Sequence, residues 1–288
     1  MQITFRNVTH TYQAGSPFQA TAIENVDFSI SSGEFLALIG HTGSGKSTLA
    51  QHINGLLRPT AGQVLIDGQD IHAHGYDKRT LRQQVGLVFQ YPEHQLFEET
   101  VEKDVGFGPR NLGLTPDEIQ ERVQEALEKV GIPYQEFKDK SPFELSGGQM
   151  RRVAMAGVLA MRPKVLVLDE PAAGLDPMSR EDMLQLIKGL HESGTTIVMI
   201  SHSMDDVARF ATRALVMKKG TIAMDGPPAQ IFLQARELEE MGLDVPVLCR
   251  LNNALKEAGL ALPEGIYEED ALFDALMQLW KGGGASAE

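Results

Sequence analysis

Hydrophobic residues along this chain follow two periods, and each period predicts a different kind of element. Up to about residue 33, apolar and polar residues alternate, as expected for half-buried antiparallel strands. Further along, short runs are apolar throughout, which is typical of strands buried on both faces of a parallel sheet. These runs lie at 35–39, 85–89, 165–168 and 196–200, and a further short strand is expected at 64–66. Helical segments separate them, so the pattern predicts an α/β fold with N-terminal antiparallel strands and a parallel core sheet.

The spacing of apolar residues also predicts where the helices lie. One helix should follow the run at 35–39 and extend to about Leu57. From about 91 to 160 the spacing is mostly helical, which predicts an inserted helical subdomain. Within this subdomain Thr115 should begin a helix, because Pro116 follows it and acidic residues occupy the first turn.

The last part of the chain is helical again and does not continue the alternation of strands and helices. We therefore predict a main domain over 1–228 and a C-terminal helical appendage over 229–281, with Pro263 and Gly265 dividing the appendage. A glycine-rich, flexible tail is predicted over 282–288.

Composition and charge narrow the class of protein. The chain has 288 residues, of which 42% are hydrophobic and 23% charged, as in ordinary soluble globular proteins. Its 26 basic and 39 acidic residues give a net charge of -13, which argues against a nucleic-acid partner. Cys249 is the single cysteine, so an internal disulfide is excluded. No apolar run approaches the roughly 18 residues of a membrane helix, and no signal peptide begins the chain, so we expect any membrane role to be peripheral.

A glycine-rich segment after the run at 35–39 predicts phosphate binding. Gly40, Gly45, Lys46 and Ser47 match the P-loop pattern G-x-x-x-x-G-K-[ST]. The glycines let backbone N–H groups turn toward phosphate oxygens, and the following helix adds the positive end of its dipole. The residues predicted to contact the nucleotide here are Gly40, His41, Thr42, Gly43, Ser44, Gly45, Lys46, Ser47 and Thr48. His41 should contribute its backbone, and an ordinary glycine-rich turn is the alternative.

Two acidic residues end the apolar run at 165–168. Asp169 is predicted to bind Mg²⁺ together with the Ser47 hydroxyl, and Glu170 to polarise the water that attacks the γ-phosphate. The alternative is a polar pair that only ends a buried strand, but the P-loop upstream favours the functional interpretation.

A second segment has the features of a phosphate-binding loop. Ser146, Gly147, Gly148 and Gln149 open a predicted helix, whose N-terminus can bind an anion. One ATP does not need two such loops from one polypeptide. We therefore expect the second loop to contact a nucleotide held by another chain.

Taken together, these motifs resemble those of ATP-binding cassette (ABC) ATPases over about residues 1–228. The resemblance implies that Tyr12 stacks on adenine, although an aromatic residue on a strand face is an alternative. It implies that Gln90 contacts Mg²⁺ and the attacking water, and that Asp176 lies in the D-loop at a dimer interface. His202 would contact the γ-phosphate as the switch histidine.

The same resemblance implies a mechanism. ATP on the P-loop of one subunit would be closed by Ser146 and Gly148 of the other, and hydrolysis would release the dimer. One departure is Ala173, where the family more often has serine. His72 and His74 lack a carboxylate or cysteine partner, so we expect a loop surface there rather than a metal site.

Segments 93–101 and 104–113 are similar to energy-coupling factor (ECF) transporter ATPases, which import vitamins and transition-metal ions. The variants at 95–97 and 107–109 resemble the second of the two paired subunits, so a heterodimer is expected. The implied partners are a second ATPase, a transmembrane coupling subunit docked near 90–110, and a separate substrate-binding membrane subunit. The chain would then lie at the cytoplasmic face of the membrane.

Other classes of cassette ATPase remain as alternatives. A conventional ABC importer is one. A DNA- or ribosome-associated ATPase is another, but the chain has neither a long coiled-coil insertion nor a second cassette. The cargo is not predicted, because in ECF systems a separate membrane protein selects it.

Overall fold

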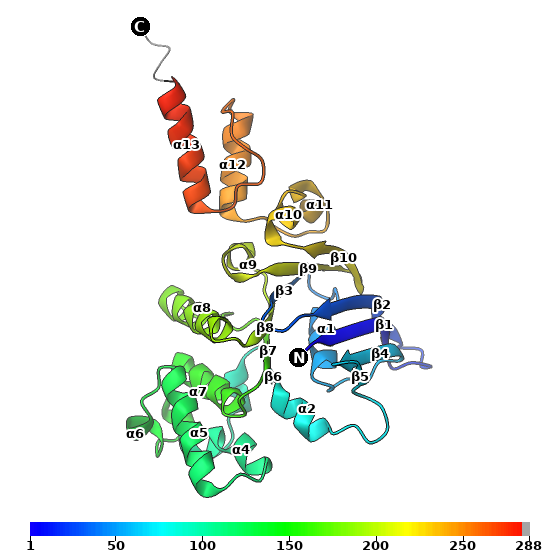
Figure 1. Cartoon of the computed structure of the whole chain (residues 1–288), viewed down its shortest axis with the longest axis vertical. Coiled ribbons are helices and arrows are strands. Elements are labelled where there is room, and N and C mark those ends of the chain that lie inside the picture. Colours follow the sequence, from blue (N-terminus) through cyan, green and yellow to red (C-terminus); the bar gives the residue numbers. More distant parts are fainter. Residues whose placement is uncertain (284–288) are drawn as a thin grey trace. The chain divides into compact units, whose positions relative to one another are not determined.

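The computed structural model describes residues 1–283, which form two compact units (Figure 1). One unit consists of Met1–Glu34 and Ser47–Ile200. The other consists of Phe35–Lys46 and the chain from Ser201 onward. No helix in the described part of the chain is long and apolar enough to cross a membrane.

The first unit begins with an antiparallel sheet. Its strands are β1 (Ile3–Tyr12), β2 (Ala20–Ile30), β4 (Ala61–Ile66) and β5 (Gln69–Asp70), in the order β2-β1-β4-β5. The inward residues of β1 and β2 are buried, and Phe5 stacks on Phe28 with ring centroids 4.6 Å apart. This confirms the antiparallel strands predicted from the alternating pattern.

Three parallel strands form the other sheet segment of this unit. They are β6 (Val85–Val88), β7 (Val165–Asp169) and β8 (Thr196–Ile200), with β7 between the other two. Every residue of β8 is buried, which explains the unbroken apolar run. Helix α2 (Lys78–Gln84) precedes β6, and α8 (Pro177–Glu192) connects β7 to β8. The predicted parallel core sheet is confirmed.

The helix after the P-loop is shorter than predicted. Helix α1 spans Lys46–Ile53, whereas the pattern had favoured an end near Leu57. The backbone turns at Gly55, where φ is 70° and the N–H donates to the His52 carbonyl at 3.2 Å. Glycine adopts this left-handed conformation without the steric cost of a Cβ, so it ends the helix.

The helical region between β6 and β7 is confirmed. It contains η1 (Pro92–Gln95), α3 (Val101–Val105), α4 (Phe107–Asn111), α5 (Pro116–Lys129), α6 (Tyr134–Phe137), η2 (Pro142–Glu144) and α7 (Gly147–Leu159). Thr115 caps α5 as predicted: its side chain accepts from the Glu118 N–H, and the Glu118 side chain accepts from the Thr115 N–H.

The second unit is built on β3 (Phe35–Ile39). This strand pairs in parallel with β9 (Arg213–Lys218), and β9 pairs antiparallel with β10 (Thr221–Gly226). Helices α9 (Met204–Phe210), α10 (Pro228–Phe232) and α11 (Ala235–Glu240) belong to the same unit. Our sequence analysis had assigned no element between 204 and 226.

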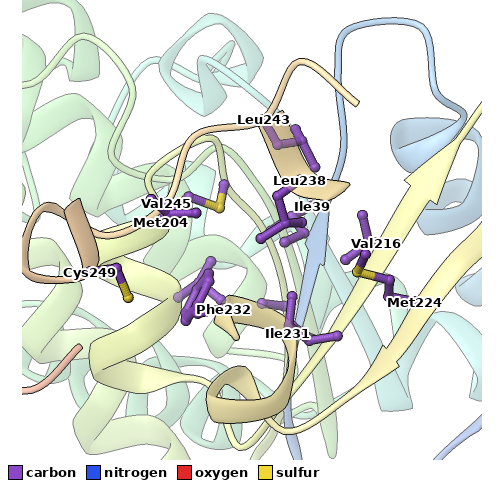
Figure 2. Packing of buried hydrophobic residues seen from close by; sticks show 13 residues of the cluster. Ile39, Met204, Val216, Met224, Ile231, Phe232, Leu238, Leu243, Val245 and Cys249 are labelled. Atoms are coloured by element: carbon purple, nitrogen blue, oxygen red, sulfur yellow. The ribbon is translucent and has the colours of Figure 1, made fainter. Parts of the chain in front are cut away.

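A continuous hydrophobic core joins these elements (Figure 2). Ile39 of β3 and Val216 of β9 pack in one buried cluster with Phe232, Leu238 and other apolar residues of the helices. The cluster extends to Cys249, which is buried on the next helix. The first helices after residue 228 are therefore part of the core around β3.

The chain ends in two longer helices, α12 (Val247–Glu257) and α13 (Glu269–Gly283). A second small cluster, formed by Leu262, Ile266 and Leu272 with partly buried residues of both helices, joins them. The break predicted at Pro263 and Gly265 lies between the helices. Of the predicted tail, 282–283 belong to α13 and 284–288 lie outside the described residues. The boundary between 228 and 229 stays a prediction.

Candidate active site

The P-loop has the backbone conformation that its glycines permit. Gly40 follows β3 directly with φ of 153°, and Gly45 precedes α1 with φ of 106°. A Cβ at Gly40 would lie 2.5 Å from the Met217 carbonyl oxygen and 2.6 Å from Ser44 Oγ, so a larger residue cannot be accommodated. Because Gly40 has no side chain, the loop can lie this close to β9.

Lys46 is folded back over this loop. Its Nζ donates to the Gly40 carbonyl at 2.6 Å and to the His41 carbonyl at 3.0 Å, and the residue is only 6% exposed. The ammonium thus lies inside the loop whose backbone would surround phosphates. Because α1 begins at Lys46, the first N–H groups of the helix have no intrahelical acceptors and can bind an anion.

The remaining loop residues differ in exposure. Thr42, Gly43 and Ser47 are exposed, whereas Ser44 and Thr48 are buried. His41 Nδ1 is 2.7 Å from the Thr42 carbonyl, and the His41 carbonyl accepts from Lys46. The backbone role of His41 toward phosphate stays a prediction.

Gln90, Asp169 and Glu170 come from neighbouring parallel strands. Asp169 ends β7, Glu170 follows it, and Gln90 lies two residues after β6, so all three lie at the carboxyl edge of the same sheet. Glu170 has φ of 52°, which is unusual for a residue with a side chain, and its N–H donates to the Ile200 carbonyl at 3.1 Å. The turn at Glu170 departs from the strand geometry that Asp169 still has.

The oxygen-bearing side chains suit a hard cation. The Ser47 hydroxyl, the Gln90 amide oxygen and the Asp169 carboxylate are the ligand types that Mg²⁺ prefers. Within residues 1–283 there is no group of three or more histidine, cysteine or acidic residues placed to hold a metal ion.

Tyr12 lies at the end of β1 and is 40% exposed. Its hydroxyl is 3.2 Å from Thr48 Oγ1 on α1, the residue after the P-loop serine. The ring is therefore fixed at its polar end and accessible to solvent elsewhere. An aromatic ring in this setting can stack on a nucleotide base.

Ser146 is the N-cap of α7, as the sequence predicted for a helix start. Its Oγ accepts from the Gln149 N–H at 3.3 Å, and Gln149 Oε1 accepts from the Ser146 N–H at 3.0 Å. A Cβ added at Gly147 would meet nothing within 4 Å. Ser146, Gly148 and Gln149 also line an open hollow of about 310 Å³, together with Arg152 and Ser179.

Asp176 and His202 precede other helices. Asp176 is the N-cap of α8 and accepts from the N–H groups of Met178 and Ser179 at 3.1 and 3.0 Å. Hydrogen bonds from the Ser179 side chain and backbone hold the pKa of Asp176 below its ordinary value. His202 is exposed and lies two residues before α9, whose N-cap is Ser203.

Arg151 is a buried residue that our sequence analysis missed. It lies on α7, is 3% exposed, and binds Glu93 of η1. The same guanidinium donates through Nη1 to the carbonyls of Pro171 and Ala173, at 3.3 and 2.6 Å. Arg151 thus connects α7 with the segments that follow Gln90 and Glu170.

His72 and His74 both lie in the loop predicted for them. His74 is exposed, whereas His72 is partly exposed and both of its ring nitrogens are shielded from solvent. Burial lowers the pKa of His72 below its ordinary value.

Comparisons with known proteins agree with this geometry. A family model described as "ABC transporter" matches residues 23–173. The "Energy-coupling factor transporter ATP-binding protein EcfA2" of Clostridium tetani is 52% identical over 281 residues, which are 97% of this chain and 98% of that protein. The solved structure of cbiO1 from Clostridium perfringens, described as part of the ABC transporter complex cbiONQ, is similar with a TM-score of 0.73 and 37% identity. The similarity covers 88% of this chain and 98% of the cbiO1 chain.

A second similar solved structure contains a bound nucleotide. An ATP-binding cassette in a dimeric, post-hydrolysis state, bound to ADP and Pi, is 31% identical with a TM-score of 0.68. The similarity covers 78% of this chain and 98% of that cassette's chain. The chain described here belongs to the ABC transporter family and is an ATP-binding, ATP-hydrolysing cassette. Its full-length relatives assign it, within that family, to the ATP-binding proteins of energy-coupling factor transporters.

Proposed function

We propose that this chain powers uptake of vitamins or transition-metal ions as one of two ATPases beneath an ECF-type membrane complex. The name of the C. tetani relative and the cbiONQ complex of the C. perfringens protein support such an assembly. The partners would be a second cassette ATPase, a transmembrane coupling subunit and a substrate-binding membrane subunit. The chain would lie at the cytoplasmic face of the membrane as a peripheral subunit, with no nucleic acid involved.

In this proposal the two ends of ATP bind to different groups of this chain. Tyr12 stacks on adenine, while the P-loop N–H groups and Lys46 bind the phosphates. The observation that carries the proposal is the placement of Lys46, whose ammonium lies 2.6 and 3.0 Å from two carbonyls of its own loop at the start of α1. A cation fixed there stabilises charge on the β- and γ-phosphates without needing to reorganise.

The hydrolytic step belongs to residues at the carboxyl edge of the sheet. Glu170 acts as the base that polarises the attacking water, Gln90 orients that water, and His202 contacts the γ-phosphate. Ser47, Gln90 and Asp169 would hold Mg²⁺, which neutralises phosphate charge when bound.

The second half of the site would come from another chain. In that arrangement Ser146, Gly147, Gly148 and Gln149 contact the γ-phosphate of a nucleotide on the partner, and Asp176 lies across the interface. The exposed N-terminus of α7 and the open space around Gly147 support this, because a phosphate could approach without a clash. The two ATPases would differ, forming a heterodimer.

Isolation of the intact complex tests the proposal. The tagged full chain, extracted from membranes in mild detergent, should co-purify with a second cassette ATPase and a transmembrane protein in fixed ratio. A Lys46→Ala chain serves as a comparison, because it should retain these partners while losing ATP binding. Recovery with ribosomes or nucleic acid, or with a periplasmic-type binding protein and a conventional transmembrane pair, would contradict the ECF assignment.

A further inference from the structure

Four residues form a closed circuit of contacts between β1 and α1. Tyr12 Oη lies 3.2 Å from Thr48 Oγ1, and His52 Nδ1 lies 2.7 Å from the Thr48 carbonyl oxygen. The His52 ring meets the His10 ring edge-on with centroids 4.8 Å apart. His10 in turn meets the Tyr12 ring edge-on at 4.6 Å, which closes the circuit.

Secondary structure explains why these four residues meet. His10 and Tyr12 are two residues apart on β1 and therefore point to the same face of the strand. Thr48 and His52 are four residues apart on α1 and therefore lie on the same face of the helix. The circuit thus connects the strand that carries Tyr12 to the helix that begins at the P-loop.

The orientation of both histidines is fixed by hydrogen bonds. A backbone carbonyl only accepts, so His52 Nδ1 must carry the proton that it donates to the Thr48 carbonyl. His10 Nδ1 likewise donates to the Arg58 carbonyl at 3.0 Å. Each imidazole is therefore held in a single tautomer, and its position follows the backbone to which it is bonded.

The four residues differ in how far they are buried. His52 is fully buried, and His10 and Thr48 are each 8% exposed, whereas Tyr12 is 40% exposed. The Nε2 atom of His52 is buried without a hydrogen-bond partner. A buried polar atom without a partner costs free energy that an apolar side chain of similar size would not. Packing alone therefore does not account for a histidine at this position.

We propose that His10 and His52 are positioning residues that hold the Tyr12 ring at a fixed angle and distance from the P-loop helix. The Tyr12 ring then keeps one position relative to α1, whose first N–H groups would bind phosphate, and ATP binds without first ordering Tyr12. The contacts among these four residues would raise the affinity for a nucleotide that carries a base, and would leave the affinity for a bare triphosphate unchanged. This inference rests on the proposed stacking of adenine on Tyr12.

Binding of two ligands to the full-length chain tests the inference. ATP and inorganic tripolyphosphate are titrated, each with Mg²⁺, into wild type, His10→Ala, His10→Phe and His52→Asn. A base stacked on an aromatic ring contributes about 1–3 kcal/mol, so Tyr12→Ala should weaken ATP binding by roughly 5- to 150-fold. The histidine variants should weaken ATP binding by roughly 3- to 30-fold, less than loss of the Tyr12 ring itself, and change tripolyphosphate binding less than about twofold.

A control variant and a comparison between the two His10 variants complete the design. His74→Ala removes an exposed histidine and should leave both affinities unchanged. His10→Phe keeps an aromatic edge against Tyr12 but loses the bond to the Arg58 carbonyl, so it should retain more ATP affinity than His10→Ala. Thermal unfolding with and without ATP shows which variants are folded, and His10→Phe keeps the test available if His52→Asn does not fold.

Two outcomes would overturn the inference. Equal weakening of both ligands would mean that the histidines support the P-loop itself, and unchanged ATP binding in folded His10→Ala would mean that they position nothing. If Tyr12→Ala binds ATP normally, the adenine platform is elsewhere and the inference fails with it. Failure of the proposed ATPase site is separate, because Lys46→Ala would then leave both ATP and tripolyphosphate binding intact.

Discussion

Arg151 binds Glu93 through two parallel charge-assisted hydrogen bonds, 3.0 Å from Nε to Oε2 and 2.9 Å from Nη2 to Oε1. The two residues are 58 positions apart in the chain, and the Arg151 side chain is 4% exposed. Although burial alone would raise the pKa of Glu93, the hydrogen bonds from Arg151 hold it below its ordinary value. The pair therefore fixes η1 against α7.

Loss of Glu93 should destabilise the fold. Glu93→Ala leaves a buried guanidinium without its counter-charge, which typically costs about 3–5 kcal/mol of unfolding free energy. Urea unfolding of the full chain at pH 7 measures this loss. The double variant Glu93→Ala/Arg151→Met removes both charges and should recover part of it.

Glu99→Ala is the matched control. Glu99 pairs with Lys103 at 2.7 Å, but its side chain is 82% exposed, and such solvent-exposed pairs contribute little to stability. Equal unfolding free energies for Glu93→Ala and Glu99→Ala would show that burial of Arg151 does not set the strength of this contact.

Glu170→Gln should separate ATP binding from hydrolysis. The amide keeps the size of the carboxylate but cannot accept a proton, so we expect turnover at least about tenfold slower and ATP binding unchanged. Phosphate release by the assembled complex and ATP titration of the chain measure the two. Glu192→Gln changes an exposed carboxylate at the end of α8 and should hydrolyse ATP normally. Near-normal turnover in Glu170→Gln would remove this residue as the base.

Gly147→Ala should reduce ATPase activity without weakening the fold. Within this chain a Cβ at Gly147 meets nothing within 4 Å, so the thermal midpoint should stay within about 2 °C, and alanine favours the helix. If the partner's nucleotide approaches this glycine, the added methyl group obstructs it. We expect at least about a tenfold loss of activity, the size of one lost phosphate contact.

Gly189→Ala provides the control for this substitution. Gly189 lies on α8 and also has open space around its Cβ position. It should hydrolyse ATP at the wild-type rate. Full activity in Gly147→Ala would count against closure of the site by this loop.

His52 should make stability depend on pH. Burial lowers the pKa of His52 from 6.5 to about 4. Between these values the unfolded chain takes up a proton that the folded chain does not, so stability falls as pH decreases from about 6.5 to 4. The pKa shift corresponds to a loss of about 3 kcal/mol of unfolding free energy at low pH. Above pH 7 this loss is absent, because His52 is neutral in both the folded and the unfolded chain.

The measurement is the unfolding free energy between pH 7.5 and 4.5 in wild type and His52→Asn. Asparagine does not titrate, so the slope in this window should be smaller in the variant. His74→Asn, at an exposed site, should keep the wild-type slope. Parallel curves for wild type and His52→Asn would show that His52 is not the group responsible.

Local pattern was sufficient for elements whose sequence signal is contained within a few residues. The run at 35–39 is β3, and the capping box at Thr115 begins α5, because burial on both faces and helix capping are each encoded within a few residues. Strand β9 was missed because its apolar run, 214–217, is short and is followed at once by two lysines and a glycine.

Residues that act through distant partners were harder to predict. Arg151 occupies the face of α7 that also carries Met155 and Leu159, and a charged residue on a buried face is the signal that could have found it. His52 similarly follows Leu49 on the buried side of α1. The pattern marks such positions as buried, but only the folded chain shows that Glu93 and His10 are what they contact.

The core in Figure 2 limits how the C-terminal region can be exchanged between relatives. Phe232 and Leu238 lie in the same buried cluster as Ile39, the last residue of the strand before the P-loop. A chimera joined at residue 228 would combine half of one core with half of another and would create cavities or overlaps around β3. With a junction in the loop between α12 and α13, all buried residues of that cluster come from one parent. Helix α13 can then be replaced while the packing around β3 stays unchanged.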